Sequence, residues 1–297
     1  MDKDLVFIVS AGRTGTTFLG NMLSVAIENC HSEHEPDDLT FSLKKNIDRI
    51  RKYGSWYMVI GRLLGISGVR PLGQKYVSGR VSEEQCLSEI VDLRRRLHSR
   101  IKESLVVESN GQWNYLVGLI HKVWPKAKII VIVRDPRTWV QSWMNRGIRY
   151  SPYDPVRFFP PGWLSPSKVG DLEWENAWSS FDTFGRLVWE WRNVNGRLLD
   201  YAESDARCHL FRYEDLFKAN CGEAMRDLVE FAAIHGKRQY RFSIPEGFTS
   251  EKHHASSGDF PHWREWDMKR AQLLDRLCGQ LMHRFHYGTE SQWHKMI

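Results

Sequence analysis

The residues with the clearest chemical potential lie in a short polar stretch near the N-terminus, Ser10 to Thr17 (SAGRTGTT). The stretch combines small residues, which let backbone N–H groups approach a ligand, with the hydroxyls of Thr16 and Thr17 and the fixed positive charge of Arg13. Amides, hydroxyls and a guanidinium are the groups that hold a phosphate or a sulfate. The stretch therefore predicts an anion-binding loop.

The loop lies between a strand pattern and a helix pattern. Leu5 to Val9 are apolar and largely β-branched, which is typical of a strand buried on both faces of a parallel sheet. After Thr17 the apolar residues recur at helical spacing, at Phe18, Leu19, Met22, Leu23, Ala26 and Ile27. A helix that begins directly after the loop adds the partial positive charge of its N-terminus to the anion site. This order of strand, loop and helix is that of a P-loop.

The loop departs from the P-loop of ATP- and GTP-binding proteins. When the second glycine of GxxxxGK[ST] is aligned with Gly15, Thr16 stands in place of the lysine and Ser10 in place of the first glycine. This favours an anion loop in which hydroxyls and Arg13 replace the lysine. A P-loop kinase acting on a nucleoside or another small molecule is one alternative, and a strand-to-helix turn without a ligand is another.

A second strand-to-helix junction carries another cation. Lys128 to Val133 (KIIVIV) is typical of a buried strand, and it runs directly into Arg134. Pro136 suits the start of the helix that follows. Ligands of open α/β sheets bind beyond the carboxyl ends of the strands, so we expect Arg13 and Arg134 to share one site. Ser142 follows Arg134 by eight positions, about two helical turns, which allows it to face the same site.

A third segment, Leu210 to Leu216 (LFRYEDL), ends a predicted strand with Tyr213 in a Tyr-Glu-Asp sequence. Together the three segments resemble the sulfotransferases that use 3′-phosphoadenosine 5′-phosphosulfate (PAPS). The RTGTT stretch is similar to the family's 5′-phosphosulfate loop, in the form found in carbohydrate and bacterial members. Arg134 with Ser142 is similar to its 3′-phosphate motif, and the Tyr-Glu-Asp segment is common in the family, with the tyrosine near the nucleotide.

The resemblance implies a fold, a reaction and a set of residues. The fold is α/β, a three-layer sandwich with a central parallel sheet and a P-loop-like strand, loop and helix, in a single domain over residues 1–297. The reaction moves a sulfuryl group from PAPS to a hydroxyl or an amine of a small-molecule or saccharide acceptor, with no metal. Arg13 is implied to be catalytic, because it neutralises the leaving oxygens. The implied cofactor-binding residues are Arg13, Thr14, Gly15, Thr16, Thr17, Arg134, Ser142 and Tyr213.

An ionisable stretch, Asn29 to Asp38 (NCHSEHEPDD), follows the first predicted helix. Pro36 disfavours helix at the residue before it, which predicts a loop that returns near the anion site. Glu35 with Pro36 resembles the Glu-Pro pair of carbohydrate sulfotransferases, which implies that Glu35 is the general base that takes the acceptor's proton. The alternative bases are Glu33, His34 and Glu108. A solvated acidic loop with no catalytic role is a further alternative.

Three later segments concern the walls of the site. Repeated prolines between Arg149 and Val169 exclude regular structure and predict an ordered loop at the acceptor pocket, or else a packed surface loop. An aromatic stripe from Trp174 to Val194 predicts one face of a single long helix that packs in the core. Lys252 to Gly258 resembles the family's nucleotide-closing segment. Its paired histidines suggest a metal, but no further ligand residues accompany them.

Composition limits the remaining classes. At 297 residues the chain is long enough for one large domain, and Lys and Arg outnumber Asp and Glu by 42 to 36, a net charge of +6. This charge suits an anionic cofactor, but the basic residues are interspersed, so we expect no nucleic-acid partner, with a polyanion-binding protein as the alternative. Five scattered cysteines predict reduced thiols in a cytoplasmic protein. We expect neither a signal peptide nor a membrane anchor.

Overall fold

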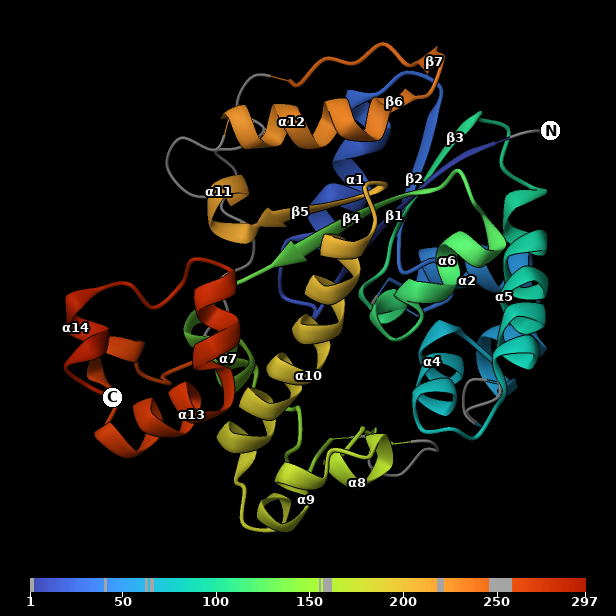
Figure 1. Ribbon diagram of the computed structural model, residues 1–297. Helices are drawn as coiled ribbons and strands as arrows, with labels where there is room; N and C mark the ends of the chain where they lie inside the picture. Colours follow the sequence, from blue (N-terminus) through green and yellow to red (C-terminus); the bar gives the residue numbers. More distant parts are fainter. Residues whose placement is uncertain are drawn as a thin grey trace.

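The computed structural model describes residues 3–39, 42–61, 64, 67–154, 156, 162–217, 222–245 and 258–297. Within these ranges a parallel sheet of five strands, in the order β2-β3-β1-β4-β5, forms the centre of the molecule. Its strands are β1 (Asp4–Ser10), β2 (Cys30–His34), β3 (Leu105–Ser109), β4 (Lys128–Val133) and β5 (Cys208–Arg212). Figure 1 shows the sheet edge-on between its covering helices. The predicted α/β class is confirmed.

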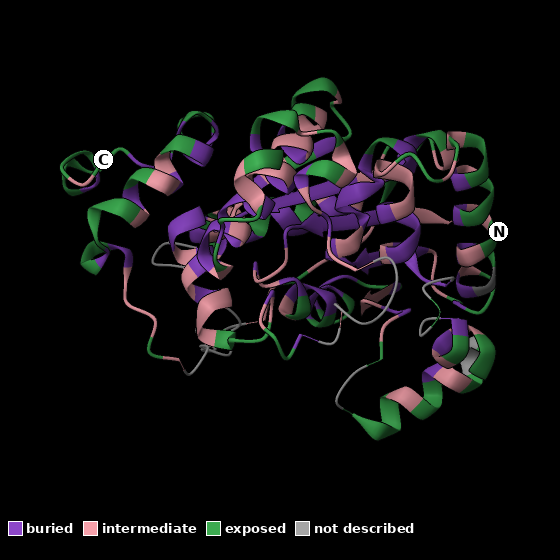
Figure 2. Ribbon diagram, turned by 90° about the horizontal axis from the view of Figure 1, so that it is seen from below, coloured by how far each residue is buried: buried purple, intermediate pink, exposed green. Residues whose placement is uncertain are grey.

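The apolar runs of the sequence form strands because both of their faces are buried. In β1, Val6 and Ile8 pack into one core, whereas Phe7 and Val9 pack into the other. The central β1 pairs with β3 on one side and with β4 on the other, in parallel register throughout. Figure 2 shows the strands buried at the centre and the exposed residues on the outer helices. A continuous apolar sequence is what a strand in this position requires.

Helices cover both faces of the sheet, which confirms the three-layer sandwich. One face is covered by α1 (Thr16–Ala26) and α12 (Gly222–Ala233), with α11 (Tyr213–Phe217) beside them. The helices of the other layer are α4 (Val69–Val77), α5 (Glu83–His98), α6 (Val117–Val123), α7 (Pro136–Arg146), α10 (Thr183–Ser204) and α13 (Met268–Arg284). The smaller helices are α2 (Leu43–Tyr53), η1 (Trp56–Ile60), η2 (Gly111–Tyr115), α8 (Pro166–Val169), α9 (Leu172–Trp178), η4 (Trp263–Glu265) and α14 (Ser291–His294), and a short hairpin joins β6 (Ile234–His235) to β7 (Arg238–Gln239).

The prediction of a loop from Asn29 to Asp38 is partly wrong. Cys30–His34 forms the edge strand β2, which pairs in parallel with β3 from Cys30 opposite Leu105 to His34 opposite Ser109. The sequence did not predict this strand because its residues are largely polar, as an edge strand buries less of its surface than a central one. The loop begins only at Glu35, so the edge strand places that residue at the carboxyl end of the sheet.

Two further predictions need correction, one of a single long helix and one of a segment without regular structure. The aromatic stripe from Trp174 to Val194 belongs to two helices, α9 and α10, because Asp182 caps a new helix by accepting a hydrogen bond from the Gly185 N–H at 2.9 Å. The proline-rich segment from Arg149 to Val169 contains the short helix α8, which Pro166 begins at a position where proline is tolerated. Residues 155 and 157–161 of that segment, and residues 252–257 of the predicted nucleotide-closing segment, lie outside the described residues.

The carboxyl ends of all five strands meet at one edge of the sheet. The residues that follow them are the anion loop after β1, Glu35 after β2, η2 after β3, Arg134 after β4 and Tyr213 after β5. This is the edge at which open parallel sheets bind ligands. In the described part of the chain, no helix is both long enough and apolar enough to cross a bilayer.

Candidate active site

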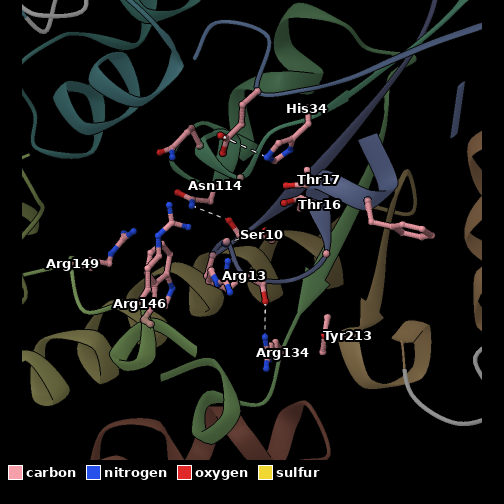
Figure 3. A pocket seen from close by; sticks show the side chains of 18 of the residues that line it. Ser10, Arg13, Thr16, Thr17, His34, Asn114, Arg134, Arg146, Arg149 and Tyr213 are labelled. Carbon is pink, nitrogen blue, oxygen red and sulfur yellow. Dashed lines mark hydrogen bonds and ion pairs between the residues drawn. The ribbon is translucent and has the colours of Figure 1, made fainter. Parts of the chain in front are cut away.

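A cavity of about 890 Å³ lies at this edge, and the segment that follows each of the five strands contributes to its lining. Arg13, Glu35, Asn114, Arg134 and Tyr213 line it, one from the segment after each strand. Its volume is in the range of pockets that hold a cofactor-sized ligand. Figure 3 shows the labelled side chains arranged around the loop that follows β1.

The anion loop holds a backbone shape that few sequences allow. Gly12, Arg13 and Gly15 all have positive φ, of 79°, 57° and 77°. At Gly15 a Cβ atom would lie only 2.5 Å from the ring of Phe217, so a side chain has no room there. The Trp139 indole donates to the Gly12 carbonyl at 2.8 Å, which fixes the loop against α7. Arg13 is a strained non-glycine residue, and such residues are concentrated at functional sites.

The first turn of α1 completes the anion site. Gly15 is its N-cap, Thr16 and Thr17 line the cavity, and the first turn contains no acidic residue to compete with an anion. The N–H groups of a helix's first turn have no partners within the helix, so they are available to a ligand. Thr14 is placed differently, because it is buried and does not line the cavity. Its backbone shapes the loop, and its Oγ1 has no partner among the described residues.

The two predicted cations meet in one cluster. Arg13 donates from Nε to the Ser142 Oγ at 3.0 Å, and Arg134 donates from Nη1 to the Arg13 carbonyl at 2.9 Å. The Arg134 guanidinium also lies 4.5 Å from the centroid of the Tyr213 ring. Ser142 is buried behind Arg13 and does not line the cavity. Of the two residues that the family resemblance assigns to a 3′-phosphate, Arg134 lines the cavity, whereas Ser142 is hydrogen-bonded to Arg13.

The cluster has an excess of positive charge. Burial lowers the pKa of the Arg13 guanidinium, and the charges of Arg146 and Arg134 lower it further. Like charges held together in a half-buried site repel one another, and an anion in the cavity would relieve that repulsion. The arrangement thus favours a multiply charged anionic ligand.

Contacts behind the site keep Arg134 in position. The Trp191 indole donates to the Arg134 carbonyl at 2.9 Å. Asp135 caps α7 by accepting from the Arg137 N–H, and its own N–H donates to Glu214 at 3.3 Å. Tyr287 donates to the other oxygen of Glu214 at 2.6 Å. The Tyr-Glu-Asp segment therefore supports Arg134 in two ways. Tyr213 packs against its guanidinium, and Glu214 accepts a hydrogen bond from the backbone of the next residue, Asp135.

Glu35 faces the same cavity from the edge strand. Its N–H donates to the Ser109 carbonyl at 3.0 Å, and its φ of 44° turns the chain sharply after β2. His34 also lines the cavity, with Nε2 3.6 Å from a Glu35 oxygen and Nδ1 2.9 Å from the Ser109 carbonyl. Since a carbonyl only accepts, Nδ1 carries the proton when the ring is neutral. Burial lowers the pKa of His34, which favours that neutral form.

The other two candidate bases lie outside the cavity. Glu33 accepts hydrogen bonds from Arg49, the shorter at 3.2 Å. Glu108 is buried and accepts from Arg94 Nε at 2.7 Å and from the Trp113 indole at 2.7 Å. Neither glutamate lines the cavity. Glu35 and His34 are thus the two candidates that a substrate in the cavity could reach.

The cavity is also lined by residues that the sequence analysis did not name as site residues, among them Asn114, Arg149 and Glu190. Arg149 donates from Nε to Glu190 at 2.8 Å and stacks 3.8 Å from the ring centroid of Trp163. Glu190 is a buried acid inside the aromatic stripe, and its position between Trp189 and Trp191 was an available signal. Asn114 gave no such signal, because only the fold brings η2 beside the anion loop.

The residues present fit PAPS as a ligand. The Gly12 to Thr17 loop offers amide and hydroxyl donors, and Arg13 and Arg134 supply two permanent cations for its phosphate and sulfate groups. Among the described residues, no three His, Cys, Asp or Glu side chains form a group that could hold a metal ion.

Comparison with known proteins identifies the family. The model of the sulfotransferase family matches residues 5–235, and the chain belongs to that family. No curated protein sequence matches it.

Three solved structures are similar to this chain. The sulfotransferase domain from the Synechococcus PCC 7002 olefin synthase is 16% identical, with a TM-score of 0.46 over 93% of this chain and 94% of that one. The sulfotransferase from Alicyclobacillus acidocaldarius is 15% identical, with a TM-score of 0.44 over 99% and 100% of the two chains. The sulfotransferase domain from the curacin biosynthetic pathway is 15% identical, with a TM-score of 0.37 over 99% and 96%.

Proposed function

We propose that this sulfotransferase uses PAPS as its donor and moves the sulfuryl group to a hydroxyl or an amine of a small-molecule or saccharide acceptor in the cytoplasm. The observation that carries the proposal is the convergence of Arg13, Arg134 and the N-terminus of α1 on a cavity that Glu35 also lines. Cations and amides fit the donor, and a carboxylate beside them fits the removal of the acceptor's proton.

The donor supplies the sulfuryl group and departs as adenosine 3′,5′-bisphosphate. In this proposal the amides of Gly15, Thr16 and Thr17 and the two threonine hydroxyls hold the 5′-phosphosulfate. Arg134 holds the 3′-phosphate, with the Tyr213 ring beside it. Arg13 neutralises the charge that grows on the leaving phosphate oxygen, as protein cations do in phosphoryl transfer.

The acceptor's oxygen or nitrogen attacks the sulfur in line with the leaving group. The new O–S or N–S bond forms as the bond from sulfur to the phosphate oxygen breaks, and the acceptor's proton passes to Glu35. A neutral His34 keeps Glu35 the stronger proton acceptor, because a protonated imidazole 3.6 Å away would stabilise the carboxylate and weaken it as a base.

Calorimetric titration tests the donor. We expect adenosine 3′,5′-bisphosphate to bind without metal and Arg134→Ala to weaken that binding at least 10-fold, since a charged hydrogen bond is lost. ATP with magnesium is titrated under the same salt. Binding of ATP alone would point to a kinase, and steeply salt-dependent binding of any polyanion would point to a nonenzymatic protein.

A second measurement tests the base. Glu35→Gln keeps the size of the side chain and removes its basicity, so the bisphosphate should bind as tightly as before while sulfuryl transfer falls at least 100-fold. Glu28→Gln, an exposed site close in sequence, is the matched control. An unchanged rate in Glu35→Gln would assign the proton to His34.

A further inference from the structure

Two residues that line the cavity each have a buried polar atom without a partner in the described part of the chain: Trp143, through its indole Nε1, and Asn114, through its Oδ1, which is the acceptor of the two. Asn114 is 7% exposed. The orientation of its amide is defined, because the other end must be the Nδ2 group that donates to the Ser10 carbonyl at 3.1 Å. Oδ1 is therefore a desolvated acceptor beside a ligand cavity, and a ligand's O–H or N–H would satisfy it.

Asn114 and Glu35 are connected to the same strand end. Ser109, the last residue of β3, accepts the Glu35 N–H through its carbonyl, and η2 with Asn114 follows directly. The fit between η2 and the anion loop is close, because a Cβ atom on Gly111 would lie 3.2 Å from the Ser10 carbonyl. Figure 3 shows Asn114 hydrogen-bonded to Ser10 at the start of the loop that carries Arg13.

The number of hydrogens at the reacting end of the acceptor decides whether it can satisfy both Glu35 and Asn114. A hydroxyl nucleophile has one hydrogen, and in the proposed reaction that hydrogen goes to Glu35, so it cannot also satisfy the Asn114 oxygen. We infer, resting on the proposed function, that the acceptor presents at least two hydrogen-bond donors at its reacting end. It is either a primary amine or a hydroxyl with a second hydroxyl or an amino group on the neighbouring carbon.

This requirement gives the site its selectivity. An acceptor with a single O–H at the reacting end leaves the Asn114 oxygen buried and unpaired in the transition state. Sites built to hydrogen-bond a substrate group discriminate strongly against analogues that lack it. We expect a difference of about 100-fold in kcat/KM between matched acceptors with and without the second donor.

The test uses pairs of acceptors that differ only in the second donor. Catechol is compared with 2-methoxyphenol, cis-cyclohexane-1,2-diol with cis-2-methoxycyclohexanol, and cyclohexylamine with N-methylcyclohexylamine. Sulfuryl transfer from PAPS to each is measured as kcat/KM. In the wild type, at least one pair should show the two-donor member preferred by about 100-fold.

Two leucine variants separate recognition from packing. Asn114→Leu should reduce the preference to within about threefold, because no acceptor oxygen remains, while the affinity for adenosine 3′,5′-bisphosphate stays within about threefold. Asn195→Leu is the matched control. Asn195 is a buried asparagine on α10 whose Nδ2 donates to the Trp191 carbonyl at 2.9 Å and whose Oδ1 also has no partner among the described residues, but it does not line the cavity. It should keep the full preference.

Each other outcome contradicts the inference at a defined step. Equal kcat/KM within every pair, or a preference that survives in Asn114→Leu, would overturn it. So would the absence of transfer to every two-donor acceptor by a protein that binds the bisphosphate. If the bisphosphate does not bind and no acceptor is sulfated, the proposed function itself fails, which is a different result.

Discussion

Ser142 accepts a 3.0 Å hydrogen bond from the Nε atom of Arg13, across 129 positions of the chain. The bond joins the anion loop after β1 to the helix after β4, so the two segments that carry the predicted cations form one unit. Arg134 strengthens the same connection by donating to the Arg13 carbonyl. Arg13 is therefore held at both its side chain and its backbone while it lines the cavity.

Removing the Ser142 hydroxyl should loosen Arg13 without removing it. We expect Ser142→Ala to lower kcat/KM about 10-fold, the effect of one charge-assisted hydrogen bond. Ser24→Ala, on the exposed face of α1, is the control and should change nothing. The double variant Arg13→Ala/Ser142→Ala decides the mechanism, because a serine that acts only through Arg13 makes the double variant no worse than Arg13→Ala. Additive losses would instead return Ser142 to the 3′-phosphate.

Removing Arg13 itself should affect catalysis more than stability. In Arg13→Ala we expect kcat/KM to fall between about 100-fold and 1000-fold, as when an oxyanion donor is removed. The free energy of unfolding should change by less than about 1 kcal/mol, because burial beside Arg134 and Arg146 already disfavours the charge. Arg13→Gly should be the more stable of the two variants, since it relieves the positive φ of 57°. Urea unfolding and initial rates measure both effects, and a normal rate in Arg13→Ala would remove Arg13 from the mechanism.

The sequence predicted the centre of the fold because its central strands are buried on both faces. Leu5 to Val9 and Lys128 to Val133 are continuous apolar runs, and a buried parallel strand is the structure that such short runs favour. The edge strand Cys30–His34 was missed because it has no such run, and pairing with β3 stabilises it in place of an apolar core. A local run of apolar residues indicates a buried strand. It does not reveal a polar edge strand, which forms because it pairs with a strand far away in the sequence.

Some residues of the candidate site could likewise be predicted from the sequence, and others could not. Arg13 and Arg134 could be predicted, since each follows a recognisable strand at the sheet edge where ligands bind. Asn114 could not be placed, because its role depends on which elements pack together, whereas the acid Glu190 stood out between two tryptophans but its partner Arg149 did not. Ser142 shows the intermediate case, in which helical spacing placed the residue near the site but did not reveal that Arg13 lies in front of it.

Two substitutions in a buried charge cluster should differ in how much unfolding free energy they cost. Arg94 pairs with both Asp37 and Glu108, and all three side chains are buried. Arg94→Leu removes the cation that the two buried carboxylates share, so it should cost about 3–5 kcal/mol of unfolding free energy. Burial raises the pKa of Glu108, and the neighbouring Asp37 raises it further, so the neutral Glu108→Gln should cost less than half as much.

The same glutamate variant also tests the alternative base. Glu108 does not line the cavity, so Glu108→Gln should retain sulfuryl transfer to within about threefold, whereas Glu35→Gln should not. Parallel urea titrations and rate measurements on the two variants give both results. A stable but inactive Glu108→Gln protein would show that this residue takes part in the chemistry after all.

His98 should make the protein sensitive to mild acid. Burial lowers its pKa to about 3, with the charges of Arg94 and Lys3 adding to the effect, and its ring lies 5.8 Å from that of Trp124. The unfolded chain binds a proton at this residue near pH 6.5 and the folded chain does not. The free energy of unfolding should therefore fall as the pH falls from about 6.5 toward 3, by at most about 1.4 kcal/mol per pH unit from this group.

His98→Phe keeps an aromatic ring against Trp124 and should reduce this dependence of the unfolding free energy on pH. His209→Phe, which replaces an exposed histidine that also contacts aromatic rings, should not. Urea unfolding at pH 7, 6, 5 and 4 compares the three proteins, and equal slopes for wild type and His98→Phe would show that His98 is protonated in the folded state.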